Sequence, residues 1–116
     1  MNPSTLIQVG LLGEALDGGP AAVFVADEDM NYIAVNEYAC RLLGYTREEL
    51  LRLRVTDVAP YPQAPDEYAE LVANGQRDGR ARLVRKDGSD VVFRYRAGET
   101  TVAGMPVYVA VGVADA

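Results

Sequence analysis

The segment over residues 27–51, DEDMNYIAVNEYACRLLGYTREELL, constrains the fold of this chain more than any other stretch. It starts with a polar turn, continues with a short apolar run at residues 32–35, and then changes to helix-forming residues. Asn36 carries the short side-chain acceptor that favours a helix N-cap, and Gly44 is a residue at which helices commonly end. The segment therefore predicts a strand that leads directly into a short helix over residues 37–43.

Two further local signals lie downstream of this helix. Thr46 and Glu49 have the spacing of a capping box, which predicts a second short helix directly after the first. Asp87-Gly88 separates two runs, residues 79–85 and 91–96, in which apolar and basic residues alternate. This pattern predicts a β-hairpin.

The remaining segments predict the other elements by their apolar periodicity and their turn residues. We expect a helix capped by Ser4 that runs to about Leu16, a strand over 21–26, a helical turn near 55–59, a helix from residue 65 or 66 to about residue 73, a loop over 98–106 and a last strand over 107–113. The last run is apolar on both faces, which is typical of a central strand. This order of elements predicts an α+β fold: a five-stranded antiparallel sheet with short helices on one face and an N-terminal amphipathic helix.

Length and composition are those of one globular domain. The chain has 116 residues, of which 49% are hydrophobic and 24% charged. Cys40 is the only cysteine, so no intramolecular disulfide can form. No apolar run is long enough to span a bilayer, and residues 1–10 lack the basic start and the cleavage site of a secretory signal. We therefore expect a cytoplasmic protein without a membrane span.

Most of the residues that catalysis or metal binding would need are missing. The chain has no histidine, which removes the commonest general base, the common haem ligand and most zinc sites. Residues 27–31 imitate the start of a calcium-binding loop, but Tyr32 and Tyr38 stand where that loop needs Gly and Glu. No glycine-rich phosphate loop is present. We expect no enzyme activity, no metal site and no haem.

Charge is unevenly distributed along the chain. Residues 1–76 contain twelve acidic and four basic residues, whereas residues 77–96 contain seven basic and three acidic ones, within a net charge of −6. A solvated sheet face explains the basic segment, and a docking surface for an acidic partner is the alternative. Nucleic acid is not expected as a partner, because the net charge is negative and no recognition motif is present.

Taken in order, these motifs resemble those of the PAS family of sensor domains. The similar segments are the acidic turn at Asp27, the helix that starts at Asn36 and ends in Gly44-Tyr45, the helix over 46–51 and the hairpin turn over 85–89. The resemblance implies a sensor module with the α+β fold predicted above.

The resemblance also implies a division of the chain. It covers about residues 20–116, which leaves residues 1–19 as an N-terminal amphipathic helix and turn. Asp115 lies where the family has an Asp that leaves the last strand toward a signalling linker. We therefore expect the output domain to lie outside this chain.

The family often has a cavity between the sheet and the short helices. The residues that we expect to line an apolar pocket there are Val25, Ile33, Val35, Leu42, Leu43, Leu50, Leu51, Val55, Val58, Leu71, Phe93, Tyr95, Val109 and Val111. This wall is mostly aliphatic and poor in charge, so we expect an apolar small molecule such as a fatty acid, bound through burial at about 25 cal/mol per Å².

Polar groups at the pocket mouth would hold the ligand's head group. The candidate anchors are Tyr45, Arg54 and Tyr68. A tricarboxylate fits less well, because the arginines of the late strands alternate with apolar residues and should point outward. These arginines are Arg80, Arg82, Arg94 and Arg96.

Two other functions are alternatives to ligand sensing. The first is a ligand-free module for dimerisation or protein interaction, because Leu6, Val9, Leu12 and Leu16 form an apolar stripe with no assigned surface, and we expect a homodimer through it. The second is non-covalent flavin binding. Light-sensing relatives bond a flavin through a cysteine in a later helix, but segment 53–57 contains none and Cys40 lies in an earlier helix, so a covalent photocycle is not expected.

Overall fold

A five-stranded antiparallel sheet forms the centre of the structure, a computed structural model that describes residues 2–115. The strands are β1 (Ala22–Ala26), β2 (Tyr32–Val35), β3 (Gln76–Val84), β4 (Asp90–Val102) and β5 (Met105–Ala114). Their order is β2-β1-β5-β4-β3, and every neighbouring pair is antiparallel. The predicted α+β fold is therefore confirmed, and β5, whose sequence is apolar on both faces, is the central strand.

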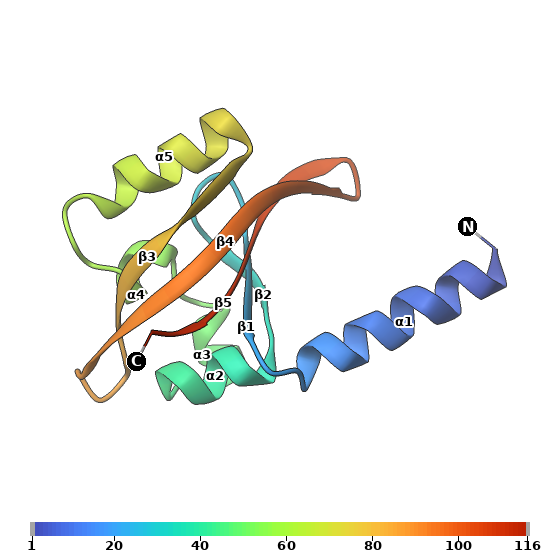
Figure 1. The fold of residues 1–116 in the computed structure, drawn as a ribbon, viewed down its shortest axis with the longest axis horizontal. Coiled ribbons are helices and arrows are strands. Elements are labelled where there is room, and N and C mark those ends of the chain that lie inside the picture. The colour runs from blue at the N-terminus through green and yellow to red at the C-terminus, as the bar shows by residue number, and fades with distance from the viewer. Residues whose placement is uncertain (1, 116) are drawn as a thin grey trace.

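Four short helices connect β2 to β3 and lie over one face of the sheet (Figure 1). They are α2 (Glu37–Leu43), α3 (Arg47–Leu50), α4 (Val55–Val58) and α5 (Ala64–Asn74). The Asn36 side chain caps α2 by accepting from Ala39 N at 3.0 Å, and Thr46 and Glu49 form the predicted capping box at α3. These caps satisfy N–H groups that a helix leaves unpaired at its start, so they fix where each short helix begins.

The core lies between these helices and the sheet. Leu43, Leu50 and Val58, one from each of α2, α3 and α4, are completely buried. Phe24 on β1 and Phe93 on β4 meet edge to face in this core, with their ring centroids 5.4 Å apart. Burial of each such side chain stabilises the fold by about 1.5–3 kcal/mol, so this layer anchors the short helices that have little stability of their own.

The connection between β4 and β5 is a tight hairpin, which corrects the expected loop over residues 98–106. Ala103 and Gly104 form the turn with positive φ angles of 50° and 78°. Val102 pairs with Met105 across this turn, and the next pair is Thr101 with Pro106. In an antiparallel ladder this next pair is one whose residues exchange no backbone hydrogen bonds with each other. The missing N–H of Pro106 then faces the side where β1, which pairs only with residues 108–112, does not reach.

Helix α1 (Pro3–Asp17) extends away from the rest of the molecule (Figure 1). Its N-cap is Asn2 rather than the expected Ser4: the Asn2 side chain accepts from Thr5 N at 2.8 Å. Pro3 explains the difference, because proline suits the first helical position. No residue of α1 is buried. Within residues 2–115, no helix combines the length and the apolar character that crossing a bilayer requires.

The C-terminal end of α1 is nevertheless tied to the sheet and to α2. The Asn36 amide donates to Leu16 O at 2.7 Å and to Ala21 O at 2.8 Å, while its oxygen also accepts from Val23 N at 3.0 Å. The carboxylate of Asp17 contacts the Arg47 guanidinium. Asn36 therefore joins the end of α1, the start of β1 and the start of α2 through one buried side chain.

Candidate functional site

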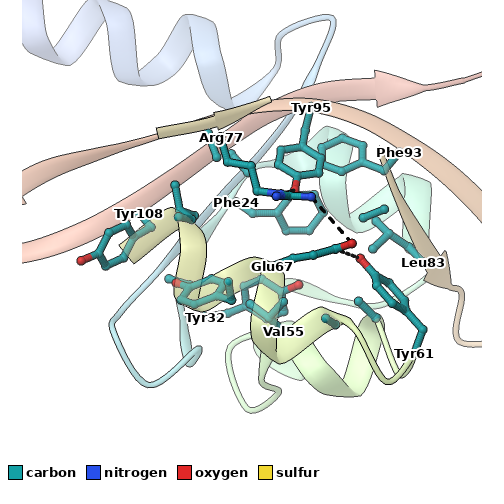
Figure 2. Close-up of a pocket in the computed structure, with 18 residues that line it drawn as sticks. Phe24, Tyr32, Val55, Tyr61, Glu67, Arg77, Leu83, Phe93, Tyr95 and Tyr108 are labelled. Carbon is teal, nitrogen blue, oxygen red and sulfur yellow. Dashed lines mark hydrogen bonds and ion pairs between the residues drawn. The ribbon is translucent and has the colours of Figure 1, made fainter. Parts of the chain in front are cut away.

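A cavity of about 90 Å³ lies between the sheet and helices α4 and α5 (Figure 2). Its lining comes from all the strands and from both helices, and consists of Phe24, Ala26, Tyr32, Val55, Ala59, Tyr61, Ala64, Glu67, Tyr68, Leu71, Arg77, Ala81, Leu83, Phe93, Tyr95, Ala97, Tyr108 and Ala110. Alanines on β1, β3, β4 and β5 face it, and their short side chains leave the space open. An apolar cavity with a few convergent polar groups is the usual form of a small-molecule site.

The wall of the cavity is rich in aromatic rings, which corrects the expectation of a mostly aliphatic wall. Seven of the nine aromatic residues of the chain line it. Phe93 stacks on Tyr95 with centroids 5.8 Å apart, and Tyr68 meets Tyr108 edge to face at 5.8 Å. Because rings offer both flat faces and polarised edges, such a wall favours ligands that can stack.

A cluster of polar side chains stands at one end of the cavity. Arg77 donates from Nη1 to Glu70 Oε2 at 2.7 Å and from Nε to Tyr95 Oη at 3.0 Å. Tyr61 Oη donates to Glu67 Oε2 at 2.6 Å, and Glu67 Oε1 lies 3.7 Å from Arg77 Nη2. The Arg77 and Glu67 side chains are 21% and 28% exposed, so the cluster lies at the mouth and reaches both the cavity and solvent. Figure 2 shows Arg77 and Glu67 pointing toward each other.

The protonation states of Tyr61 and Arg77 in this cluster follow from their contacts. Burial, together with the hydrogen bond to Glu67, raises the pKa of the Tyr61 hydroxyl, which therefore stays neutral and donates. The hydrogen bond to Tyr95 and the nearby carboxylates raise the pKa of Arg77 further. The mouth thus combines the permanent cation of Arg77 and the neutral hydroxyl of Tyr61 with the side chains of Glu67, Glu70 and Tyr95 that they contact.

The structure brings some of the expected pocket residues together. Val55, Leu71, Phe93 and Tyr95 line the cavity. Five others do not line it but pack in or against the neighbouring core: Val35, Leu42, Leu43, Leu50 and Val58. Their burial supports the cavity indirectly, because they hold α2, α3 and α4 against the sheet.

Five expected pocket residues lie elsewhere, and this is a correction. Ile33, Leu51 and Val111 are 44%, 41% and 40% exposed. Val25 and Val109 alternate along their strands with Phe24 and with Tyr108 and Ala110, which face the cavity, so they point to the opposite side of the sheet. The face was assigned one residue out of step because β1 and β5 are apolar at every position and carry no alternating signal.

Of the three candidate anchors for a ligand head group, one lines the cavity and two do not. Tyr68 lines the cavity, and its hydroxyl donates to Asp27 O at 2.7 Å. Tyr45 packs against the core and is not part of the lining. Arg54 is also outside the lining, because its guanidinium donates to Asp29 O at 2.7 Å and so fixes the turn between β1 and β2.

Sequence reasoning missed Arg77, Glu67 and Tyr61 at the mouth. A signal for Glu67 and Arg77 exists: Glu67 and Glu70 stand three residues apart on one side of α5, and the turn at Gly75, with φ 74°, reverses the chain so that Arg77 meets them. An acidic pair, a reversal and a basic residue therefore indicate an ion pair across the helix–strand junction.

The late arginines point away from the cavity, as expected. Arg80, Arg82 and Arg96 are highly exposed and pair with Asp115, Asp90 and Asp78. These pairs neutralise much of the basic segment on the sheet's outer side.

Cys40 lies outside the cavity as well, on α2, where burial raises the pKa of its thiol. Within the part of the chain that the structure describes, no group of three or more Cys, Asp or Glu side chains is placed to hold a metal ion.

An antiparallel sheet covered on one face by short helices encloses a small apolar cavity in this α+β domain. The sequence matches the PAS domain family over residues 20–113, and the chain belongs to that family. PAS domains are sensory and signalling modules. The comparison with curated proteins found no match.

Solved structures share the fold at low sequence identity. A PAS domain of a two-component sensor histidine kinase superposes with a TM-score of 0.84 at 14% identity, covering 96% of this chain and 99% of that one. A PAS domain of an HTR-like protein from Haloarcula marismortui gives 0.82 at 22% identity, covering 97% and 96%. An RNA-binding light-oxygen-voltage receptor gives 0.81 at 21% identity, covering 98% of this chain and 34% of the receptor. At these identities the likeness concerns the fold.

Proposed function

We propose that this PAS domain senses an apolar small molecule in the cavity between its sheet and helices α4 and α5, and relays binding to an output domain or partner. The observation that carries the proposal is the cavity itself, a ring-lined space of about 90 Å³ with a polar mouth. Burying a ligand there would gain about 25 cal/mol per Å² of apolar surface removed from water.

The size of the cavity bears on which apolar ligand fits. An engineered apolar cavity of about 150 Å³ accommodates benzene, so the present space suits a compact molecule. A fatty acyl chain, the ligand expected from the sequence, is longer and would enter only with outward movement of α5. The free energy that would offset such movement is about 0.8 kcal/mol for each methylene that the ligand buries.

Strand β5 supplies a route from the cavity to the C-terminal end of the domain. Tyr108 and Ala110 on β5 line the cavity, and the strand leads from them to Asp115. Asp115 Oδ2 lies 2.9 Å from Arg80 Nε, and Asp115 N donates to Val92 O at 2.8 Å. A shift of β5 on ligand binding would therefore move Asp115 and change its contacts with Arg80 and Val92. The family's signalling linkers begin at this position.

Filling the cavity should abolish sensing without disturbing the fold. Ala110→Leu adds three carbons that point into the cavity, and we expect this variant to lose the thermal stabilisation that ligands give the natural chain. Val111→Leu is the matched control, because the next residue faces the opposite, exposed side. Native mass spectrometry of the purified chain, with a thermal-shift series of fatty acids from short to long, supplies the measurement.

Two results would contradict this proposal. One is a purified chain that carries no bound molecule and is stabilised by no apolar compound. The other is an Ala110→Leu variant that is stabilised as strongly as Val111→Leu. An absorbance spectrum of the same sample tests the alternative of non-covalent flavin binding.

Dimerisation through α1 is the second candidate function, favoured by the exposure of its apolar stripe. Leu6, Val9, Leu12 and Leu16 are 58%, 53%, 61% and 50% exposed, although apolar side chains of this size are normally covered. Ile7 and Leu11, on the other side of the helix, are exposed as well. A second copy of the chain would bury this stripe.

The double variant Leu6→Glu/Leu12→Glu should convert a dimer into a monomer, because it places charges in the stripe. Ser4→Glu is the control, since it adds an acid in the first helical turn, where negative charge is favourable. Sedimentation velocity gives the association state. A natural chain that is monomeric at high concentration, or a dimer that survives the double substitution, would rule out α1 as the dimer helix.

A further inference from the structure

The mouth of the cavity presents two hydrogen-bond donors that no residue within 2–115 accepts. Arg77 uses Nε for Tyr95 and Nη1 for Glu70, while Nη2 lies 3.7 Å from Glu67 Oε1, beyond hydrogen-bond distance. Tyr95 Oη accepts from Arg77, and its own O–H has no acceptor in the described chain. A planar cationic group and a hydroxyl, joined by one hydrogen bond, thus offer donors at the same place.

A carboxylate is the ligand group that this arrangement suits. It brings two acceptor oxygens in one plane, and charge-assisted bonds to arginine are about twice as strong as neutral ones. Glu67 faces the same Arg77 nitrogen but is held by Tyr61 at 2.6 Å, so it remains too far to use that nitrogen fully. Glu70 is 56% exposed and lies on the solvent side, where water weakens its charge.

Beyond these donors the wall is shaped for a flat body. Tyr95, which supplies the hydroxyl, stacks on Phe93 with an interplanar angle of 17°, and Phe93 meets Phe24 at 76°. A ring that enters next to the hydroxyl can therefore lie along one aromatic face and against an aromatic edge, a geometry worth about 0.5–1.5 kcal/mol per pair beyond burial. The volume of about 90 Å³ is smaller than that of a cavity of about 150 Å³ that accommodates benzene, so it limits this body to one ring, which enters with a small outward movement of α5.

We propose that the ligand of this cavity is a small monocarboxylate with a compact aromatic body, of which benzoate is the simplest probe. Its carboxylate binds Arg77 Nη2 and the Tyr95 hydroxyl, and its ring packs among Phe24, Phe93 and Tyr95. This inference rests on the proposed sensing function, because it names the ligand class of the same cavity.

Titration of the 116-residue chain by two-dimensional NMR tests the ligand class. The probes are benzoate, benzyl alcohol as the neutral analogue, benzylamine as the cationic one and hexanoate as the flexible acid. We expect benzoate to shift cavity resonances and to bind about tenfold or more tightly than benzyl alcohol, because benzoate gains a charge-assisted pair with Arg77 that the neutral alcohol cannot form.

Variants at the mouth separate the charge from the cavity. Arg77→Met should weaken benzoate binding about tenfold or more and leave benzyl alcohol nearly unchanged. Glu67→Gln should tighten benzoate binding, because it removes a competing negative charge yet keeps an acceptor for Tyr61. Arg94→Met is the matched control: it removes an exposed arginine that is not part of the cavity lining. The opposite signs at Arg77 and Glu67 cannot arise from a general loss of stability.

Each negative result of these titrations contradicts a different part of the proposal. Equal binding of benzyl alcohol and benzoate, with no effect of Arg77→Met, overturns the carboxylate class while the sensing function stands. Tighter binding of benzylamine, weakened by Glu67→Gln, overturns it in favour of a cation. Hexanoate binding as tightly as benzoate overturns the aromatic body. If none of the four probes shifts a cavity resonance, this inference is overturned, and the sensing function falls too when the fatty acids of the thermal-shift series also fail to stabilise the chain.

Discussion

Replacing Asn36 by alanine is expected to lower the free energy of unfolding by about 3 kcal/mol, a large part of the stability of a domain of this size. The side chain is 5% exposed and makes four hydrogen bonds to backbone groups. Alanine leaves two N–H groups and two carbonyls without these partners, and each buried unpaired group costs about 1–3 kcal/mol, less where water can enter. Urea unfolding followed by circular dichroism gives the measurement.

Two comparisons show how much of this loss is helix capping. Thr46→Ala removes an exposed N-cap from α3 and should cost only about 1 kcal/mol. Asn36→Ser keeps a cap acceptor, but the serine side chain is too short to reach Leu16 O and Ala21 O. Its loss of unfolding free energy should therefore lie between those of Thr46→Ala and Asn36→Ala. If Asn36→Ala costs no more than Thr46→Ala, the bonds outside the cap contribute little, and Asn36 is only a helix start.

The same variant should release α1 from the domain. Asn36 Nδ2 holds the carbonyl of Leu16, the last residue but one of α1, and this is one of few ties between α1 and the rest of the molecule. We expect faster amide hydrogen exchange over residues 18–23 in Asn36→Ala, with little change in β4 as long as the domain is folded. Such a result would show that Asn36, the N-cap of α2, helps to hold the end of α1 against the domain.

Local elements were predictable because their determinants are neighbours in sequence. The Asn36 cap, the Thr46–Glu49 capping box and the turn at Asp87-Gly88 each depend on residues within about one helical turn, and all three form as expected. The β4–β5 turn was missed for a related reason. Ala103-Gly104 carries a positive φ on an alanine, which sequence statistics disfavour, and the pairing along β4 and β5 imposes it.

The cavity wall was less predictable because it depends on strand faces and on contacts between distant segments. Where a strand alternates, as β4 does at Val91, Phe93 and Tyr95, the inward face was assigned correctly. Where both faces are apolar, as in β5, the sequence does not distinguish Tyr108 from Val109. Arg77 was missed because an arginine is expected outward, and only the packing of α5 over β3 gives it carboxylate partners at the mouth.

Replacing Gly112 by alanine is expected to destabilise the domain by about 3 kcal/mol and to weaken ligand binding in those molecules that stay folded. A Cβ atom at Gly112 would lie 2.1 Å from Arg94 O and 2.9 Å from Phe93 Cε1. The carbonyl belongs to the neighbouring strand β4 and cannot move without disturbing the ladder, so β4 and β5 must separate locally. Thermal unfolding measures the first effect.

The second effect follows from the position of Phe93, which has the Gly112 backbone on one side and the cavity on the other. A methyl group at Gly112 pushes the ring toward Phe24 and into a space of only about 90 Å³. Gly98→Ala, on the neighbouring strand β4, is the matched control, because a Cβ at Gly98 meets nothing closer than Gly75 O at 4.0 Å. We expect Gly98→Ala to retain ligand-dependent stabilisation and Gly112→Ala to lose it. Equal stability and equal ligand response of the two variants would contradict this account, because the close approach of β4 and β5 at Gly112 is what sets the position of the Phe93 ring in the cavity wall.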